Sequence, residues 1–382
     1  MPQISYREQN IKHNLTAKMQ RITAEDKSII SLAVGDPDFV TPEPILNYAK
    51  QMLAKSTHYS SAEGIPQLRH AIAQKLRKEN KINANPDEIV VTTGSQEAIF
   101  LSLLATLDPK CEVLLPSPGY MLYEQPIRLV SAVPKYYPLK GGCDFEIETN
   151  DIQKRITKKT RAIILTTPSN PTGAVMSRKK LREIADIAIK NNLMVFSDEA
   201  YEKLVYGKEH VSIASLPGMK NRTMTFQTFS KAYAMAGFRI GYVHAPKNFV
   251  RALTESNEYV SLCAPVISQY MALKALSISD RYIKQMRNEY NRRRKFMVNR
   301  LNEIGLHTCE PFGAFYTFSD ITKFSKNSLN FTKHILKKAK VSVMPGSEFG
   351  PFGEGHIRCA YSTAMPKLEI AMNRIERCLK LK

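Results

Sequence analysis

One segment of the sequence combines a lysine with groups that suit a phosphate. Lys231 follows two hydroxyl residues, Thr228 and Ser230, and precedes Arg239, which is bracketed by two glycines. A lysine amine can form a Schiff base with an aldehyde, and small hydroxyls with a guanidinium can bind a phosphate dianion. Taken singly, these residues would be a surface lysine and a solvated arginine. Together they indicate a phosphorylated aldehyde, and pyridoxal phosphate (PLP) has this chemistry.

Two upstream segments could hold other parts of such a cofactor. In the first, a strand end is followed by Gly94, Ser95 and Gln96, where a helix is expected to begin. Free N–H groups and the positive dipole end of a helix bind anions, so we expect the phosphate here. In the second, Tyr120 follows a tight turn and could stack on a planar ring. The alternatives are a simple helix cap at Ser95 and an ordinary packed aromatic residue at Tyr120.

Polar residues also follow two apolar strands in the middle of the chain. Asn170 lies in a loop with two prolines and a glycine, and its amide could bond a ring oxygen. Asp198 ends the second strand, where a buried carboxylate facing a pyridine nitrogen would keep that nitrogen protonated. Tyr201 is well placed to bond the ring phenolate oxygen. An unremarkable turn at Asn170 and a helix N-cap at Asp198 are the structural alternatives.

These residues need a scaffold that brings strand ends together, and the hydrophobic pattern predicts one. Short apolar runs alternate with helical stretches such as Ser95–Leu107 and Ser177–Asn191. Continuous apolar runs are typical of a parallel sheet covered by helices on both faces, so we expect a doubly wound, mostly parallel α/β sheet. Ligands bind such sheets where strands end and helices begin. The predicted strands are Glu88–Thr93, Glu112–Pro116, Arg161–Thr166, Leu193–Asp198, Thr223–Thr228 and Arg239–His244.

The pattern changes near residue 280, which predicts two domains. A long basic helix from Arg281 to Leu301 leads into short β-rich runs and a final helix from Pro366. We expect residues 41–285 to form the large α/β domain, and residues 1–40 with 286–382 to form a smaller α+β domain. The sequence shows no internal repeat, and no long flexible linker separates the two domains.

Composition narrows the classes of function. The 382 residues carry 55 Lys and Arg against 35 Asp and Glu, a formal charge of +20. No basic run is interleaved with aromatic residues, which disfavours a nucleic-acid surface and favours a solvated exterior that could steer acidic substrates. No apolar run approaches the roughly 20 residues that span a bilayer, and the N-terminus lacks an apolar signal core. We expect a cytoplasmic protein that does not contact membranes or nucleic acid.

Cysteine and histidine spacing gives no sign of a metal site. The eight histidines lack metal-binding spacing, and the cysteines contain no Cys-x-x-Cys pair. We therefore expect no metal, and free thiols in a reducing compartment. The six cysteines are Cys111, Cys143, Cys263, Cys309, Cys359 and Cys378.

Across its length the sequence resembles the class I, fold-type I aminotransferases that depend on PLP. The matching motifs, in order, are Gly35–Phe39, Tyr59 with Gly64–Arg69, Gly94–Gln96, Pro118–Tyr120, Asn170–Gly173, Asp198–Tyr201, Ser230–Lys231 with Arg239, and Arg358. The resemblance implies that Lys231 forms the Schiff base with PLP and that Asp198 pairs with the pyridinium. It also implies that Tyr201 and Asn170 contact the ring oxygen.

The same resemblance implies how phosphate and substrate are held. Ser230, Arg239 and the Ser95–Gln96 backbone would bind the phosphate, with Thr228 nearby. Tyr59 would reach the phosphate of a neighbouring subunit, which implies a homodimer with shared active sites. Gly35 and Arg358 would receive the substrate α-carboxylate, and Asn170 is also expected to be a substrate-binding residue.

The resulting hypothesis is a ping-pong transfer of an amino group from an L-amino acid to a 2-oxo acid, with Lys231 moving the Cα proton. PLP-dependent β- or γ-lyases share the scaffold and are the alternative. A PLP-sensing transcription regulator would need a DNA-binding module before Gly35, where only about thirty residues lie. The amino-acid donor stays open, and the +20 charge leans slightly toward aspartate or glutamate.

Overall fold

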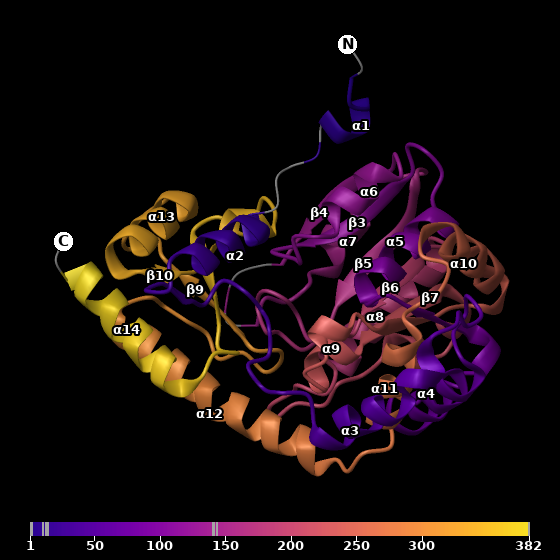
Figure 1. The fold of residues 1–382 in the computed structure, drawn as a ribbon. Coiled ribbons are helices and arrows are strands. Elements are labelled where there is room, and N and C mark those ends of the chain that lie inside the picture. Colours follow the sequence, from indigo (N-terminus) through magenta and orange to yellow (C-terminus); the bar gives the residue numbers. More distant parts are fainter. Residues whose placement is uncertain (1–2, 10, 12–14, 140–141, 143, 381–382) are drawn as a thin grey trace.

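A seven-stranded sheet forms the centre of the larger part of the molecule (Figure 1). The structure is a computed structural model that describes residues 3–9, 11, 15–139, 142 and 144–380. Only β8 runs antiparallel to its neighbours, so the predicted mostly parallel α/β sheet is confirmed. In spatial order the strands are β2 (Ile89–Thr92), β8 (Gly241–His244), β7 (Thr223–Thr228), β6 (Met194–Asp198), β5 (Thr160–Thr166), β3 (Glu112–Ser117) and β4 (Val133–Pro138).

One strand of this sheet, β4, was not predicted from the sequence. It contains Pro134 and Pro138, and proline cannot donate a hydrogen bond to a neighbouring strand. The structure places β4 at the edge of the sheet, beside β3, where a missing donor is tolerated. The two prolines therefore made the sequence read as something other than a strand. The sequence pattern does not reveal that this segment lies at the edge of the sheet, where proline is compatible with a strand.

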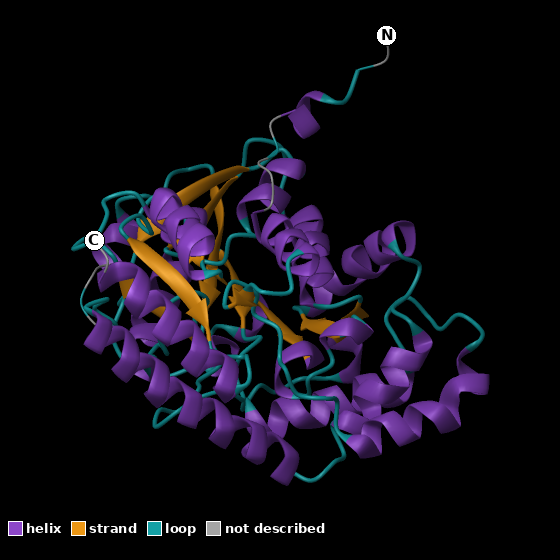
Figure 2. Cartoon of the chain, turned by 60° about the vertical axis from the view of Figure 1, so that its left-hand side comes forward, coloured by secondary structure: helices purple, strands orange, loops and turns teal. Residues whose placement is uncertain are grey.

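Helices cover both faces of the sheet, as the continuous apolar strands require (Figure 2). In β5, Ala162 and Ile164 pack into one buried cluster, while Ile163 and Leu165 pack into another on the opposite face. The covering helices are α3 (Glu43–Met52), α4 (Pro66–Glu79), α5 (Ser95–Thr106), α6 (Glu124–Leu129), α7 (Thr149–Gln153), α8 (Arg178–Lys190), α9 (Phe229–Ala232), α10 (Lys247–Val260) and α11 (Val266–Ala275).

The smaller part is built from segments of the N-terminal and the C-terminal regions of the chain. Strand β1 (Ile30–Ser31) pairs in parallel with β10 (Val341–Ser342), and β11 (Met344–Pro345), β12 (His356–Ala360) and β9 (Tyr316–Asp320) form an antiparallel sheet. Its helices are α2 (Leu15–Glu25), α12 (Arg281–Ile304), α13 (Ser328–Ala339) and α14 (Met365–Lys380). The short helix α1 (Tyr6–Gln9) lies instead near α6 of the larger part (Figure 1). The predicted domain limits at residues 40 and 285 stay a prediction; α12 runs through the second of them.

Two further observations bear on the composition. Within the described part of the chain, no helix is both long enough and apolar enough to cross a membrane. Cys111, Cys263 and Cys359 are free thiols, but Cys309 is disulfide-bonded, so the prediction of free thiols is wrong there. Cys143 lies outside the described residues. Sequence spacing cannot reveal such a bond, because the fold can bring distant cysteines together.

Candidate active site

The ends of the central strands surround one pocket of about 330 Å³. Most residues that were predicted to act together line it, although they come from segments spread over more than three hundred positions. Twelve of the predicted residues are in its walls: Gly35, Ser95, Gln96, Tyr120, Asn170, Asp198, Tyr201, Thr228, Ser230, Lys231, Arg239 and Arg358.

Lys231 is held in the pocket by the turn that follows β7. The Thr228 hydroxyl caps the short helix α9 by accepting a hydrogen bond from the backbone N–H of Ser230 at 3.2 Å. Lys231 Nζ donates to the carbonyl oxygen of Gly35 at 2.7 Å. Removal from water lowers the pKa of Lys231 to about 8, and the positive charges of Arg358 and Arg239 act in the same direction. A substantial fraction of neutral, nucleophilic amine is therefore present near neutral pH.

Asp198 is a buried acid at the end of β6. Its two carboxylate oxygens accept hydrogen bonds from the Tyr123 hydroxyl at 2.5 Å and from the backbone N–H of Ala200 at 3.1 Å. The described residues form no ion pair with it, and burial raises the pKa of Asp198 despite these hydrogen bonds. A cationic group placed beside this carboxylate would restore its charged form.

Arg358 lines the same pocket from β12. Its Nη1 donates to Asn170 Oδ1 at 2.9 Å and its Nη2 donates to the carbonyl oxygen of Ala33. Its Nε is buried without a hydrogen-bond partner. The guanidinium also packs over the ring of Tyr316, 4.4 Å from the ring centre. This is a fixed cation with an unused donor, which suits a carboxylate ligand.

Close backbone packing shapes the end of the pocket near α5. A Cβ atom on Gly94 would lie 2.6 Å from Arg239 Nη2, and one on Gly241 would lie 2.6 Å from the backbone nitrogen of Ser95. Arg239 itself adopts a left-handed φ of 49°. The glycines thus let the guanidinium reach the first turn of α5, where free N–H groups and a positive charge together can bind a phosphate.

Two tyrosines complete the site and were not predicted. Tyr123 bonds Asp198, and the Tyr316 hydroxyl lies 2.8 Å from the Tyr201 hydroxyl. Tyr120 packs edge-on against Tyr123, with ring centres 5.2 Å apart. The only signal for Tyr123 in the sequence is its position three residues after Tyr120. Tyr316 lies in the β-rich region after residue 301, to which the sequence assigned no site residue before Arg358.

Two predicted residues do not line the pocket. Gly94 contributes by its lack of a side chain beside Arg239. The Tyr59 side chain is 82% exposed at the surface. Conversely, Ala17 and Gln20 of α2 do line the pocket, and sequence reasoning gave that helix no role.

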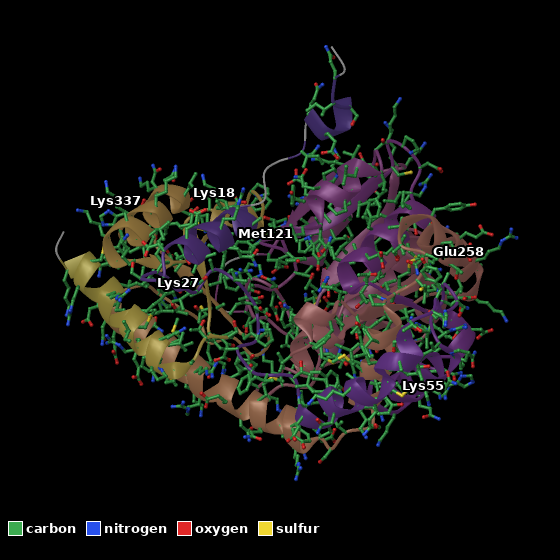
Figure 3. All side chains as sticks on the ribbon, viewed as in Figure 1. Lys18, Lys27, Lys55, Met121, Glu258 and Lys337 are labelled. Atoms are coloured by element: carbon green, nitrogen blue, oxygen red, sulfur yellow. The ribbon has the colours of Figure 1, made fainter. Side chains whose placement is uncertain are left out.

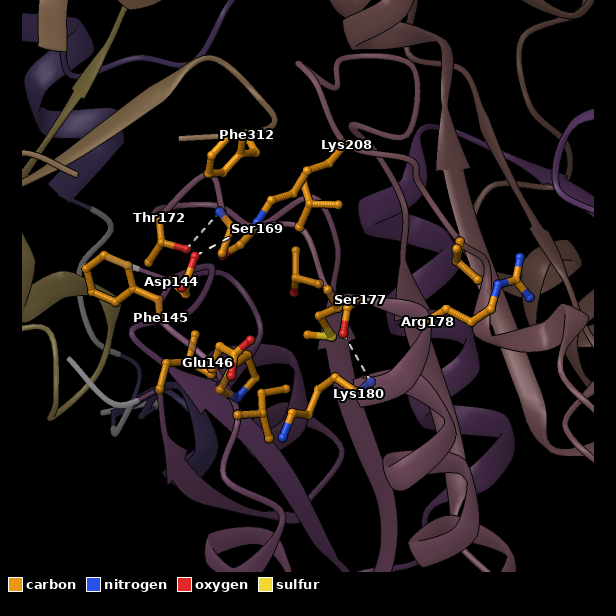
Figure 4. Close-up of a pocket in the computed structure, with 18 of the residues that line it drawn as sticks. Asp144, Phe145, Glu146, Ser169, Thr172, Ser177, Arg178, Lys180, Lys208 and Phe312 are labelled. Carbon is orange, nitrogen blue, oxygen red and sulfur yellow. Dashed lines mark hydrogen bonds and ion pairs between the residues drawn. The ribbon is translucent and has the colours of Figure 1, made fainter. Parts of the chain in front are cut away.

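A second cavity, of about 290 Å³, lies next to this one (Figure 4). The two share Thr166 in their walls, and Ser169 and Thr172 line the second from the same loop that carries Asn170. Within its lining, Lys208 pairs with Asp144 at 3.9 Å. None of the titratable residues of the first pocket reaches it.

A buried polar cluster also lies outside the pocket. Glu199, Glu202 and His210 place ligand atoms within 4.8 Å of one another, a spacing that could hold a metal ion. The ammonium group of Lys75 already contacts Glu202 and donates to Gln227 Oε1 at 2.5 Å. Because protein groups balance these charges, we do not assign a metal to the cluster.

Comparison with known proteins decides between the reactions that this geometry allows. The family model "Aminotransferase class I and II" matches residues 27–375. The chain belongs to this aminotransferase family. It is 44% identical to an aspartate aminotransferase of Pyrococcus abyssi over 96% of this chain and 95% of that one. It is 45% identical to aromatic-amino-acid aminotransferase 2 of Thermococcus litoralis over 93% of each chain.

Solved structures agree with this assignment. The aminotransferase is similar to the aspartate aminotransferase of Thermus thermophilus with maleate, at a TM-score of 0.95 and 32% identity over 99% of this chain and 100% of that one. It is also similar to the aromatic aminotransferase of Pyrococcus horikoshii, at a TM-score of 0.90 and 43% identity over 96% and 99%. The fold-type I prediction is confirmed, and transamination is supported over the lyase alternative.

Proposed function

We propose that this aminotransferase binds PLP in the pocket around Lys231 and moves an amino group between an L-amino acid and a 2-oxo acid. The observation that carries the proposal is a pair of incompletely satisfied polar side chains, Asp198 and Arg358, in the wall of one pocket. Asp198 is a buried acid with no ion pair among the described residues, and Arg358 has a buried Nε without an acceptor. A protonated pyridine and a substrate carboxylate would satisfy them.

PLP, when bound, supplies an aldehyde that condenses with amines and a ring that accepts electron density from the substrate Cα. Asp198 would hold the proton on the ring nitrogen, with Tyr123 fixing the orientation of the carboxylate. Tyr201 and Asn170 would bond the ring oxygen. Tyr120 would pack on the ring face. Arg239, Ser230, Thr228 and the backbone of Ser95 and Gln96 would bind the phosphate.

Lys231 would take part in two proton transfers, because its amine can gain and lose a proton near neutral pH. Lys231 Nζ would remove the proton from the substrate Cα and hold it until it is returned later in the reaction. Its pKa of about 8 suits both steps near neutral pH. Arg358 and the backbone at Gly35 would hold the α-carboxylate, so that the Cα–H bond faces Lys231.

The test is to replace Lys231 with alanine. Wild-type protein incubated with PLP should show a visible absorption band, and borohydride should trap a pyridoxyl adduct on the peptide that contains Lys231. The Lys231→Ala variant should lack both and lose turnover by roughly a thousandfold or more. Lys203→Ala removes another buried lysine outside the pocket and is the control. An active, coloured Lys231→Ala protein would contradict the proposal.

We also propose a homodimer. Tyr59 is 82% exposed, and other large apolar side chains are exposed nearby in the fold: Leu53 at 64%, Tyr259 at 91% and Leu262 at 43%. The Asn257 side chain donates to the carbonyl oxygen of Ala62 at 2.8 Å, which ties the two segments together. Such patches are typical of protein interfaces. Sedimentation velocity showing only a monomer would contradict it. Location in the cytoplasm stays a prediction for cell fractionation to test.

A further inference from the structure

We propose that the pocket selects an amino donor with an uncharged, apolar side chain, and that Met121 and helix α2 form the wall against which that side chain packs. The inference rests on the proposed function, because it assigns the substrate class for the same site. It also opposes the slight leaning toward acidic substrates that the net charge of +20 suggested.

The first step is the inventory of positive charge. Among the described residues that line the pocket, the cations are Lys231, Arg239 and Arg358. The proposed function uses all three, for covalent attachment, phosphate and α-carboxylate. A dicarboxylic donor needs a further cation for its side chain, since an unpaired carboxylate removed from water is strongly disfavoured. The described residues of this chain that line the pocket offer none.

The second step is the apolar wall. Met121, Leu122 and Ile99 line the pocket together with Ala17 of α2. Met121 packs against the same buried cluster as Leu15 and Ile22, and so lies between α2 and the large sheet (Figure 3). A flexible, polarizable methionine adapts well to apolar side chains of different shape. These residues therefore give the pocket an apolar wall against which an apolar substrate side chain can pack.

The third step concerns the neutral amides. Gln96 and Gln20 line the pocket, and Gln96 Nε2 already donates to the carbonyl oxygen of Leu122 at 3.2 Å. Gln20 is neutral and cannot balance a carboxylate. Lys18, also on α2, is exposed and does not line the pocket. Among the described residues, the other positively charged side chains therefore lie outside the lining of the pocket.

Sequence similarity does not decide the substrate. An aspartate aminotransferase and an aromatic-amino-acid aminotransferase match at 44% and 45% identity, and both cover more than nine tenths of the chain. The lining of the pocket is the feature that separates the two substrate classes here.

The experiment follows the spectral change of the PLP-loaded enzyme on mixing with one amino acid at a time. We expect the second-order rate constant with phenylalanine or leucine to exceed that with aspartate or glutamate by roughly tenfold or more. Equal or faster reaction with aspartate or glutamate would overturn the inference, and a cation donated by a second subunit would produce that result. If no amino acid changes the spectrum, the proposed function itself fails.

A charge placed in the wall sharpens the test. Met121→Lys should raise the rate with aspartate relative to phenylalanine by about tenfold or more, while Met121→Leu should keep the wild-type ratio. Ile370→Lys adds the same charge on α14, outside the pocket, and should leave the ratio unchanged. An unchanged ratio in a folded Met121→Lys protein would overturn the assignment of Met121 to the wall.

Discussion

Asp198 and Glu199 are consecutive acids at the end of β6, yet they lie in opposite electrostatic environments. Asp198 lines the pocket, and its partners are neutral donors. Glu199 is fully buried in the cluster with Lys75 and Glu202, where it accepts hydrogen bonds from Ser212 at 2.6 Å and from Gln227 at 3.3 Å. Asp198 can therefore accept a cationic partner from a ligand. Glu199 is hydrogen-bonded by groups of the chain itself.

The pKa shifts express the same contrast. Burial raises the pKa of Asp198, and the hydrogen bonds from Tyr123 and Ala200 and the charge of Lys231 offset that rise only in part. Burial also acts to raise the pKa of Glu202, but the charges of Lys75 and Lys203 outweigh it and lower that pKa to about 2. Two buried clusters that look alike in composition can thus be told apart. The pocket around Asp198, whose buried carboxylate has no ion pair among the described residues, is the candidate active site.

The largest expected effect comes from Asp198→Asn. This change should lower kcat by roughly a thousandfold, since the ring nitrogen loses its counter-ion. The free energy of unfolding should change by less than about 1 kcal/mol, because no ion pair is lost. Steady-state kinetics and urea unfolding measure the two quantities. Glu199→Gln is the matched control, and it should lower stability while keeping kcat close to wild type. Equal rate losses in both variants would break the comparison.

The next effect concerns Lys75 in the internal cluster. Lys75→Met leaves Glu202 without its main counter-charge and should cost about 3–5 kcal/mol of unfolding free energy. Urea unfolding at neutral pH measures this loss. Lys78→Met, an exposed position on the same helix, should change stability by less than about 0.5 kcal/mol. Adding Glu202→Gln to Lys75→Met should recover part of the loss; no recovery would show that charge balance is not what Lys75 provides.

The smallest effect is a pH dependence. Because the pKa of Lys231 is lowered from 10.5 to about 8, its amine is protonated below pH 8 and neutral above it. At pH 7 about one tenth of the amine is neutral, against roughly one part in three thousand for an ordinary lysine. The rate of PLP attachment to the cofactor-free protein should therefore rise about tenfold per pH unit up to pH 8 and then level off. A rise that continues to pH 10 would contradict the shift.

Much of the fold and site could be predicted because the informative residues follow strands. Asp198 ends β6 and Thr228 ends β7, and parallel strands bring their ends to one edge. Apolar runs fixed most strand limits within two residues. The exception was β4, whose prolines are compatible with a strand only at an edge.

Other features depend on contacts that a linear pattern does not contain. Tyr316 meets Tyr201 across 115 positions, and α2 reaches the pocket from the N-terminal end of the chain. Cys309 forms a disulfide that spacing did not suggest. The sequence singled out Asp198 by its place at the strand end, but the hydrogen bonds that satisfy Glu199 depend on folded neighbours such as Ser212 and Gln227.

The pairing of β1 with β10 has a consequence for how the protein is made. Ile30 leaves the ribosome roughly three hundred residues before its partner Val341. The central sheet can assemble while β1 is still unpaired, since all its strands lie between these two segments. Gly35 follows β1 closely and Arg358 lies on β12, so the part of the pocket that these two residues line is completed only after residue 358 has been synthesised.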